Sequence, residues 1–201
     1  MHLTDQQGHD PEPNRPAPAH LSGRVVVLVS GLPGVGKSVL VDALAPRLGA
    51  AVASRDAARI GSTPGGPRGL TEAIAWRFAH RRLASAQRRA GLILEATVAQ
   101  HLDAGRSVVV EAVAEPALRQ RLHGVALDHD AGFVQLECVL PNRAEHYRRL
   151  GLRTEGQRFW RTVVASVESG YQVPAGCLSL DTSATPNEVA DWALSLILSA
   201  R

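Results

Sequence analysis

The chain has 201 residues, 45% of them hydrophobic and 20% charged, and a formal net charge of +3. This composition is ordinary for one globular domain with a sizeable core. No apolar run is long enough to span a membrane and the N-terminus lacks the order of a signal peptide, so we expect a cytoplasmic protein without a membrane partner. Three Trp, two Tyr and three Phe are too few to indicate a base-stacking surface, which leaves nucleic acid open as a partner without favouring it.

The first 23 residues contain four prolines and almost no apolar side chains. Such a segment cannot bury enough apolar surface to offset the entropy of ordering it. We therefore predict a disordered tail over residues 1–23 and a single domain over residues 24–201. Within that domain, Cys138 and Cys177 lie in apolar runs, and we expect both to be reduced thiols.

The most specific motif is Gly31–Ser38, GLPGVGKS, which follows the apolar run Val25–Val29 and precedes apolar residues at helical spacing up to Leu48. It fits G-x-x-x-x-G-K-[S/T], the phosphate-binding loop or P-loop, between a buried strand and a helix. Glycines let backbone amides approach a phosphate closely, and the helix N-terminus adds a favourable dipole. The predicted cofactor-binding residues are Gly31, Leu32, Pro33, Gly34, Val35, Gly36, Lys37 and Ser38.

Two residues of this loop have separate predicted roles. Lys37 would bridge the β- and γ-phosphates of a nucleotide, and the Ser38 hydroxyl would ligate Mg²⁺. Lys37 is the only lysine among 22 basic residues, so a compact ammonium occurs only where this chemistry requires one. We therefore expect ATP and Mg²⁺ as cofactors.

A second candidate site follows the short predicted strand Ala50–Ala53. In the segment SRDAAR, Asp56 is placed to accept the proton of an attacking hydroxyl, and Arg59, one helical turn later, to hold the acceptor substrate. The alternative is an ordinary helix N-cap aspartate with a surface arginine.

The next segments are a glycine- and proline-rich loop over Gly61–Gly69 and a basic helix from Thr71 to about Ala104, which we expect to be interrupted near Gly91. The arginines of this helix are either a solvated face or a patch for an anionic substrate. A buried strand, Ser107–Val110, then ends in Glu111. Glu111 would orient a Mg²⁺-bound water or the acceptor hydroxyl, or it would form a structural ion pair.

The last third of the chain contains a predicted strand over Phe133–Leu140 and a helix bearing Arg149 and Arg153 on one face. These arginines would act as a lid that neutralises charge on the transferring phosphate; the alternative is a helix salt-bridged through Glu145. Another strand, Cys177–Leu180, is followed by the loop predicted to hold the adenine ring, which consists of Asp181, Thr182 and Ser183.

The final helix has a clear start signal. Thr185 and Glu188 form a capping box with proline at the first helical position. The predicted core face of this helix consists of Val189, Trp192, Ala193, Leu196 and Ile197. Together, apolar strands separated by helices predict one α/β domain with five parallel strands.

Residues 24–200 resemble the small P-loop kinases grouped with polynucleotide 5′-kinase and chloramphenicol phosphotransferase, which are AAA-type ATP-binding kinases related to gluconate kinase and zeta-toxin-like kinases. The resemblance implies a P-loop NTPase fold: a five-stranded parallel sheet of order 2-3-1-4-5 with helices on both faces and a small helical lid. The matching segments are GLPGVGKS, SRDAAR (Ser54–Arg59), GRSVVVEA (Gly105–Ala112), RRLGLR (Arg148–Arg153) and LDTS (Leu180–Ser183).

The same resemblance implies roles for individual residues. Asp56 corresponds to the general base, Arg59 to the acceptor clamp, and Arg149 and Arg153 to the lid arginines. The chain departs from the pattern at Glu111, where relatives often carry aspartate.

The favoured function is an ATP-dependent kinase that phosphorylates a hydroxyl of a small molecule, such as a metabolite, an antibiotic or a nucleoside-like compound. The alternatives are a nucleotide-binding regulatory ATPase or switch module and a 5′-OH polynucleotide kinase. The chain has no N-K-x-D motif for guanine, which argues against a GTPase. The sequence carries no signal of oligomeric state.

Overall fold

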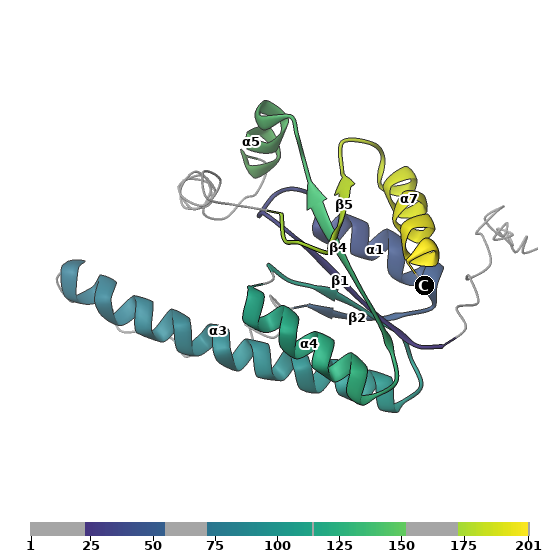
Figure 1. Cartoon of the computed structure of the whole chain (residues 1–201). Coiled ribbons are helices and arrows are strands. Elements are labelled where there is room, and N and C mark those ends of the chain that lie inside the picture. Colours follow the sequence, from purple (N-terminus) through teal and green to yellow (C-terminus); the bar gives the residue numbers. More distant parts are fainter. Residues whose placement is uncertain (1–22, 55–71, 114, 152–172, 201) are drawn as a thin grey trace, which may run out of the picture.

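The strand β1 (Val25–Gly31) is the middle strand of a five-stranded parallel sheet in the computed structural model, which describes residues 23–54, 72–113, 115–151 and 173–200 (Figure 1). The sheet order is β2-β3-β1-β4-β5, so the predicted order is confirmed. The other strands are β2 (Ala51–Ser54), β3 (Val108–Glu111), β4 (Gly132–Val139) and β5 (Leu178–Asp181).

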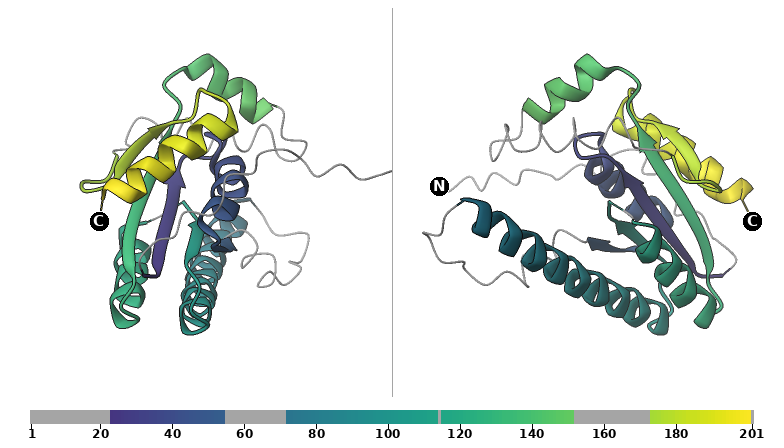
Figure 2. Two further views of the ribbon diagram at one scale, coloured as in Figure 1. Left: turned by 90° about the vertical axis from the view of Figure 1, so that its right-hand side faces the viewer. Right: turned by 60° about the vertical axis from the view of Figure 1, so that its left-hand side comes forward.

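Helices cover both faces of this sheet, as the apolar, non-alternating strands predict (Figure 2). Val25, Val27 and Val29 of β1 pack in one core with α1 and α7, whereas Val26 and Leu28 pack in a second core with α3 and α4. Every residue of β1 is buried because successive side chains point into opposite layers. The helices are α1 (Lys37–Leu48), α3 (Glu72–Asp103), α4 (Pro116–Asp128), α5 (Arg143–Gly151) and α7 (Pro186–Ser199).

The expected interruption of the basic helix near Gly91 is wrong, because α3 runs without a break from Glu72 to Asp103. A Cβ added at Gly91 would lie 3.1 Å from Arg121 Nη2 and 3.9 Å from Leu118 Cδ1, both on α4. Gly91 therefore allows two helices to approach closely. Its role is in packing, and it does not break the helix.

The capping box at the start of α7 is confirmed, since Thr185 N donates to Glu188 Oε2 at 3.0 Å and Glu188 N donates to Thr185 Oγ1. The predicted core face of this helix is partly wrong. Trp192 is 49% exposed, and the buried residues of α7 are Val189, Ala190, Ala193 and Ile197. Ala190 and Ala193 take the buried positions in the core that α7 shares with α1, and the large indole of Trp192 stays half exposed.

The strand register gathers the functional segments at one edge of the sheet. Val29 is paired with Glu111 of β3, and Gly31 is paired with Cys138 of β4. Because all strands are parallel, the P-loop, Glu111 and the loop after β5 leave from their carboxyl ends, where open α/β sheets bind ligands.

Two further expectations concern the thiols and the membrane. Both cysteines are free, as expected, and burial raises the pKa of Cys138 to about 12. Over the residues that the structure describes, no helix is both long and apolar enough to cross a bilayer. The predicted tail lies outside the described residues, apart from Gly23.

Candidate active site

The P-loop connects the end of β1 to the start of α1. Gly34 and Gly36 have φ values of +87° and +102°, in the left-handed region that favours glycine. Gly36 is the N-cap of α1 and makes no side-chain cap hydrogen bond. The first amides of α1 are therefore not covered by a capping side chain, and with the helix dipole they suit an anion.

A cavity of about 320 Å³ opens beside this loop. One wall is formed by the P-loop and α1, and another by α5 and the segment from β5 to α7. The lining residues are Gly34, Gly36, Lys37, Ser38, Val39, Leu40, Arg149, Thr182, Ala184, Pro186 and Val189. The cavity thus has a polar part, suited to phosphate, and an apolar part, suited to a flat ring.

Lys37 lies in the polar part of the cavity. Its side chain is 92% buried (8% exposed), and its Nζ donates a hydrogen bond of 2.9 Å to the carbonyl oxygen of Leu32. The ammonium group is therefore held against the P-loop itself, at the cavity, where a bound phosphate would contact it.

Ser38 and Glu111 meet at the start of α1. The Ser38 hydroxyl donates a hydrogen bond of 2.5 Å to Glu111 Oε1. Glu111 forms no salt bridge with any residue that the structure describes, so the predicted alternative of a structural ion pair finds no support there. A hydroxyl and a carboxylate are the oxygen donors that suit Mg²⁺.

A dedicated metal cage is not needed beside this pair. In the described ranges, no three His, Cys, Asp or Glu side chains are grouped as metal ligands. Magnesium in nucleotide sites keeps few protein ligands and binds mainly to phosphate oxygens and water. The donor set of Ser38 and Glu111 fits that mode.

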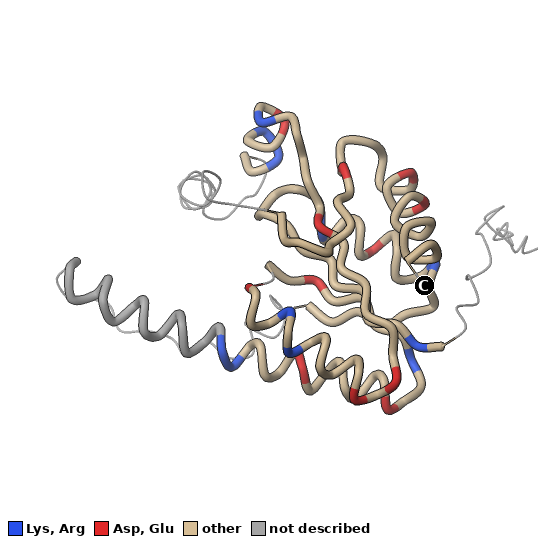
Figure 3. The backbone as a smooth tube through the Cα atoms, viewed as in Figure 1, with Lys and Arg blue, Asp and Glu red and all other residues tan. Residues whose placement is uncertain are grey.

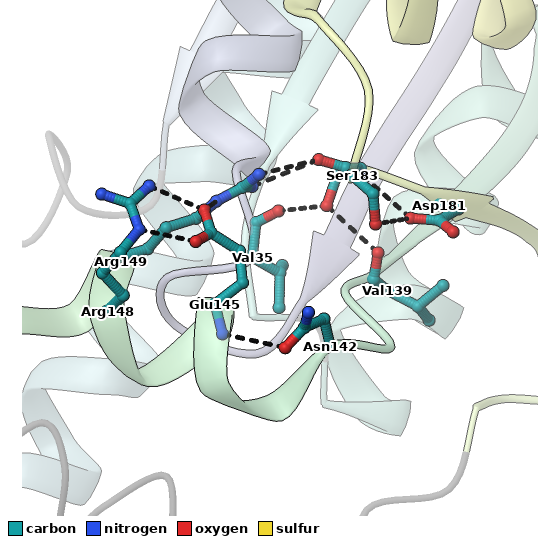
Figure 4. A network of polar contacts seen from close by, with 9 residues as sticks. Val35, Val139, Asn142, Glu145, Arg148, Arg149, Asp181 and Ser183 are labelled. Atoms are coloured by element: carbon teal, nitrogen blue, oxygen red, sulfur yellow. Dashed lines mark hydrogen bonds and ion pairs between the residues drawn. The ribbon is translucent and has the colours of Figure 1, made fainter.

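Arg149 reaches the cavity from α5, a short helix that carries both basic and acidic residues (Figure 3). Its Nη1 and Nη2 donate to the Thr182 carbonyl at 3.2 Å each, and its Nε donates to Glu145 Oε1 at 2.8 Å (Figure 4). Hydrogen bonds from Arg148 and Arg149 lower the pKa of Glu145 to about 2. The predicted alternative of a helix salt-bridged through Glu145 is therefore present, and Arg149 also lines the cavity, while its role as a lid arginine stays a prediction.

Thr182 connects the two walls of the cavity. Its buried hydroxyl lies 2.5 Å from the carbonyl oxygen of Val35 in the P-loop and 3.1 Å from that of Val139 at the end of β4. Of the predicted adenine loop, Thr182 lines the cavity, whereas Asp181 Oδ1 accepts hydrogen bonds from the amide and hydroxyl of Ser183. Asp181 and Ser183 therefore brace the turn.

Several cavity residues were missed by sequence reasoning. Val39, Ala184 and Pro186 line the apolar part, but an apolar residue beside a helix start has no sequence signal that separates a ligand wall from core packing. The predicted base Asp56, clamp Arg59 and lid residue Arg153 lie outside the described residues, so their roles stay predictions.

The profile of the AAA domain family AAA_33 matches residues 26–174, which include the P-loop, Glu111 and α5. The chain belongs to this AAA domain family. No curated protein matches the chain by sequence.

Solved structures show which members of the P-loop class share this architecture. An APS kinase from Mycobacterium tuberculosis superposes with a TM-score of 0.60 at 19% identity, covering 87% of this chain and 98% of that one. A sugar kinase from Janibacter sp. HTCC2649 superposes with a TM-score of 0.57 at 18% identity, covering 87% of this chain and 94% of that one. A gluconokinase from Sinorhizobium meliloti 1021 superposes with a TM-score of 0.50 at 18% identity, covering 88% of this chain and 98% of that one. This AAA domain therefore has the fold of small P-loop kinases.

Proposed function

We propose that the protein is an ATP-dependent kinase that transfers the γ-phosphate to a hydroxyl group of a small molecule. The observation that carries this proposal is the shared cavity. Lys37 and Ser38 at the start of α1 and Arg149 on α5 line one hollow at the carboxyl edge of the sheet. The cationic side chains of Lys37 and Arg149, with the metal-binding hydroxyl of Ser38, can stabilise the negative charge of the phosphoryl group during its transfer.

The nucleotide half of the reaction is assigned to the P-loop, the loop after β5, Glu111 and the two lid arginines. The P-loop amides and Lys37 hold the phosphates, and the base occupies the apolar part of the cavity beside the loop Asp181–Ser183. Ser38, with Glu111 behind it, holds Mg²⁺, which when bound offsets charge on the phosphate oxygens. Arg149, aided by Arg153, stabilises the transferring group.

The acceptor half is assigned to the segment after β2. The acceptor hydroxyl gives its proton to Asp56 while its oxygen bonds to the γ-phosphorus. The bond from that phosphorus to the β–γ bridging oxygen breaks, and ADP leaves with the electron pair. Arg59 holds the acceptor in line, because correct placement supplies much of the rate of such reactions.

The names of similar solved structures favour a small-molecule acceptor. The neighbours by structure are named APS kinase, sugar kinase and gluconokinase, and the APS kinase was solved with AMPPNP and APS. The low aromatic content supports the same choice over nucleic acid.

The test is a transfer assay with γ-labelled ATP and a panel of sugars, antibiotics, nucleosides and 5′-OH oligonucleotides. The proposal expects label in a small-molecule acceptor, and loss of transfer with retained ATP binding in Asp56→Asn. Asp128→Asn, an exposed aspartate at the end of α4, is the matched control and keeps wild-type transfer. Label in the oligonucleotides alone would support a polynucleotide kinase, and nucleotide binding without any transfer would support a regulatory switch.

A further inference from the structure

Helix α5 contacts the P-loop through a face that the transfer chemistry above does not use. His146 is 3% exposed, and its Nε2 lies 2.8 Å from the carbonyl oxygen of Pro33. Leu150, one turn later, is fully buried. A Cβ at Gly34 would lie 2.7 Å from Leu150 Cδ2 and 3.4 Å from His146 Cδ2, so this face of α5 lies directly on the loop.

The His146 contact has a defined direction. A backbone carbonyl can only accept a hydrogen bond, so Nε2 carries the hydrogen and donates it to Pro33. The carbonyl that it holds belongs to the peptide unit joining Pro33 to Gly34.

That peptide unit is the centre of a tight turn. Val35 N donates to Leu32 O at 3.5 Å, which closes a four-residue turn with Pro33 and Gly34 in the middle. Proline at the second position and a glycine with φ of +87° at the third fit a type II turn. A type I turn differs from it chiefly by a flip of this central peptide unit.

The flip would matter for ligand binding. A trans peptide is planar, and its C=O and N–H point in opposite directions. While His146 holds the Pro33 carbonyl, the Gly34 amide must point away from α5. Gly34 lines the cavity and His146 does not, so the orientation of this peptide unit matters for whether the loop offers a donor or a carbonyl to a phosphate.

We propose that His146 is a positioning residue of the P-loop: its Nε2–H fixes the Pro33–Gly34 peptide so that the Gly34 amide is available to phosphate. Leu150 supports the loop from the same face of α5. The inference rests on the proposed nucleotide site and assigns a residue outside the P-loop motif to it.

The experiment measures dissociation constants for Mg-ATP and for Mg-tripolyphosphate, which lacks a base. His146→Ala is expected to weaken both by the same factor, roughly 3- to 10-fold, the value of one hydrogen bond. His146→Gln places an amide N–H near the position of Nε2 and keeps both constants within about twofold of wild type. His146→Asn places its amide near Nδ1 instead and behaves like alanine. His123→Ala, an exposed histidine on α4, is the control.

Thermal unfolding without ligand separates positioning from a merely structural role. The Gln and Asn variants are expected to unfold at similar temperatures yet to differ in phosphate affinity. If the alanine variant does not fold, the comparison of these two variants tests the positioning role. Three results would overturn this inference but leave the proposed function standing. They are wild-type affinity for both probes in His146→Ala, equal affinities in the Gln and Asn variants, and weakening confined to ATP. A wild-type protein that binds neither probe would contradict the proposed function as well.

Discussion

The Ser38 hydroxyl donates a 2.5 Å hydrogen bond to Glu111, across the gap between the start of α1 and the end of β3. The contact places a carboxylate directly behind the hydroxyl that we assign to Mg²⁺. Partners of this kind orient a metal ligand, and their loss commonly lowers metal affinity about 10- to 100-fold.

We therefore expect Glu111→Gln to raise the Mg²⁺ concentration needed for half-maximal activity by about tenfold or more. Nucleotide binding measured in EDTA should stay unchanged, because the phosphate cradle is not altered. Glu95→Gln is a matched control, since Glu95 is engaged by Arg121 at 2.6 Å on the α3–α4 layer. An unchanged Mg²⁺ requirement in Glu111→Gln would remove Glu111 from the metal site.

Lys37 is expected to tolerate neither removal nor replacement by arginine. The ammonium group is buried and hydrogen-bonded to Leu32 O, and the larger planar guanidinium does not fit this geometry. Loss of one such electrostatic group should lower kcat by about 100-fold or more in both Lys37→Ala and Lys37→Arg. Steady-state kinetics with saturating ATP would test this, and full activity of Lys37→Arg would show that only positive charge is needed.

The Gly34 position is expected to be intolerant for two separable reasons. Alanine there must adopt a φ of +87°, which costs about 1–2 kcal/mol, and its Cβ would also meet Leu150. Gly105→Ala isolates the first cost, because Gly105 has a φ of +73° and nothing within 4 Å of an added Cβ. Denaturant unfolding should show a larger loss of stability for Gly34→Ala than for Gly105→Ala.

A double-mutant cycle with Leu150→Ala completes this test. Removing the Leu150 side chain relieves the clash, so the two substitutions should be less destabilising together than the sum of their separate effects. Strict additivity would mean that α5 does not rest on the loop in solution.

The ion pairs of Glu145 predict a specific pH dependence of stability. Its pKa is lowered from 4.5 to about 2 by Arg148 and Arg149, so the folded protein binds the proton less readily than the unfolded chain. The stabilisation is therefore complete above about pH 4.5 and is lost as the pH falls toward 2. The difference in melting temperature between wild type and Glu145→Gln should shrink over that interval and be constant from pH 6 to 8, as thermal melts in a pH series can show.

The sequence predicted the parts of this fold that have local causes. The unbroken apolar residues of β1 predict a strand covered on both faces, and GLPGVGKS carries its own backbone requirements. The details that depend on tertiary contacts were not predictable in this way. Gly91 was interpreted from its helix propensity, but its position is decided by the approach of α4. Trp192 has core spacing, but the small side chains of Ala190 and Ala193 take the buried positions of α7, and Trp192 is 49% exposed.

The same distinction applies to the candidate site. Lys37 and Ser38 are fixed within one motif, so their positions follow from the sequence. Thr182 accepts a hydrogen bond from Arg149 at its own carbonyl, and its hydroxyl is bonded to the carbonyl oxygens of Val35 and Val139. Every residue has a backbone carbonyl, so the residue types could not predict these contacts. The place of Arg149 in the cavity wall depends on that carbonyl, so only the folded chain reveals it.

The central place of β1 has a consequence for how the protein is made. This strand pairs Val26 with Val108 on one side and with Phe133 on the other, so both of its neighbours come much later in the chain. Contacts so distant in sequence form slowly, and β1 leaves the ribosome long before either partner exists. The segment that holds the phosphate cradle therefore cannot be completed until β4 has emerged. A nascent chain shorter than that carries an apolar strand with unpaired edges, which is the kind of surface that is prone to aggregate.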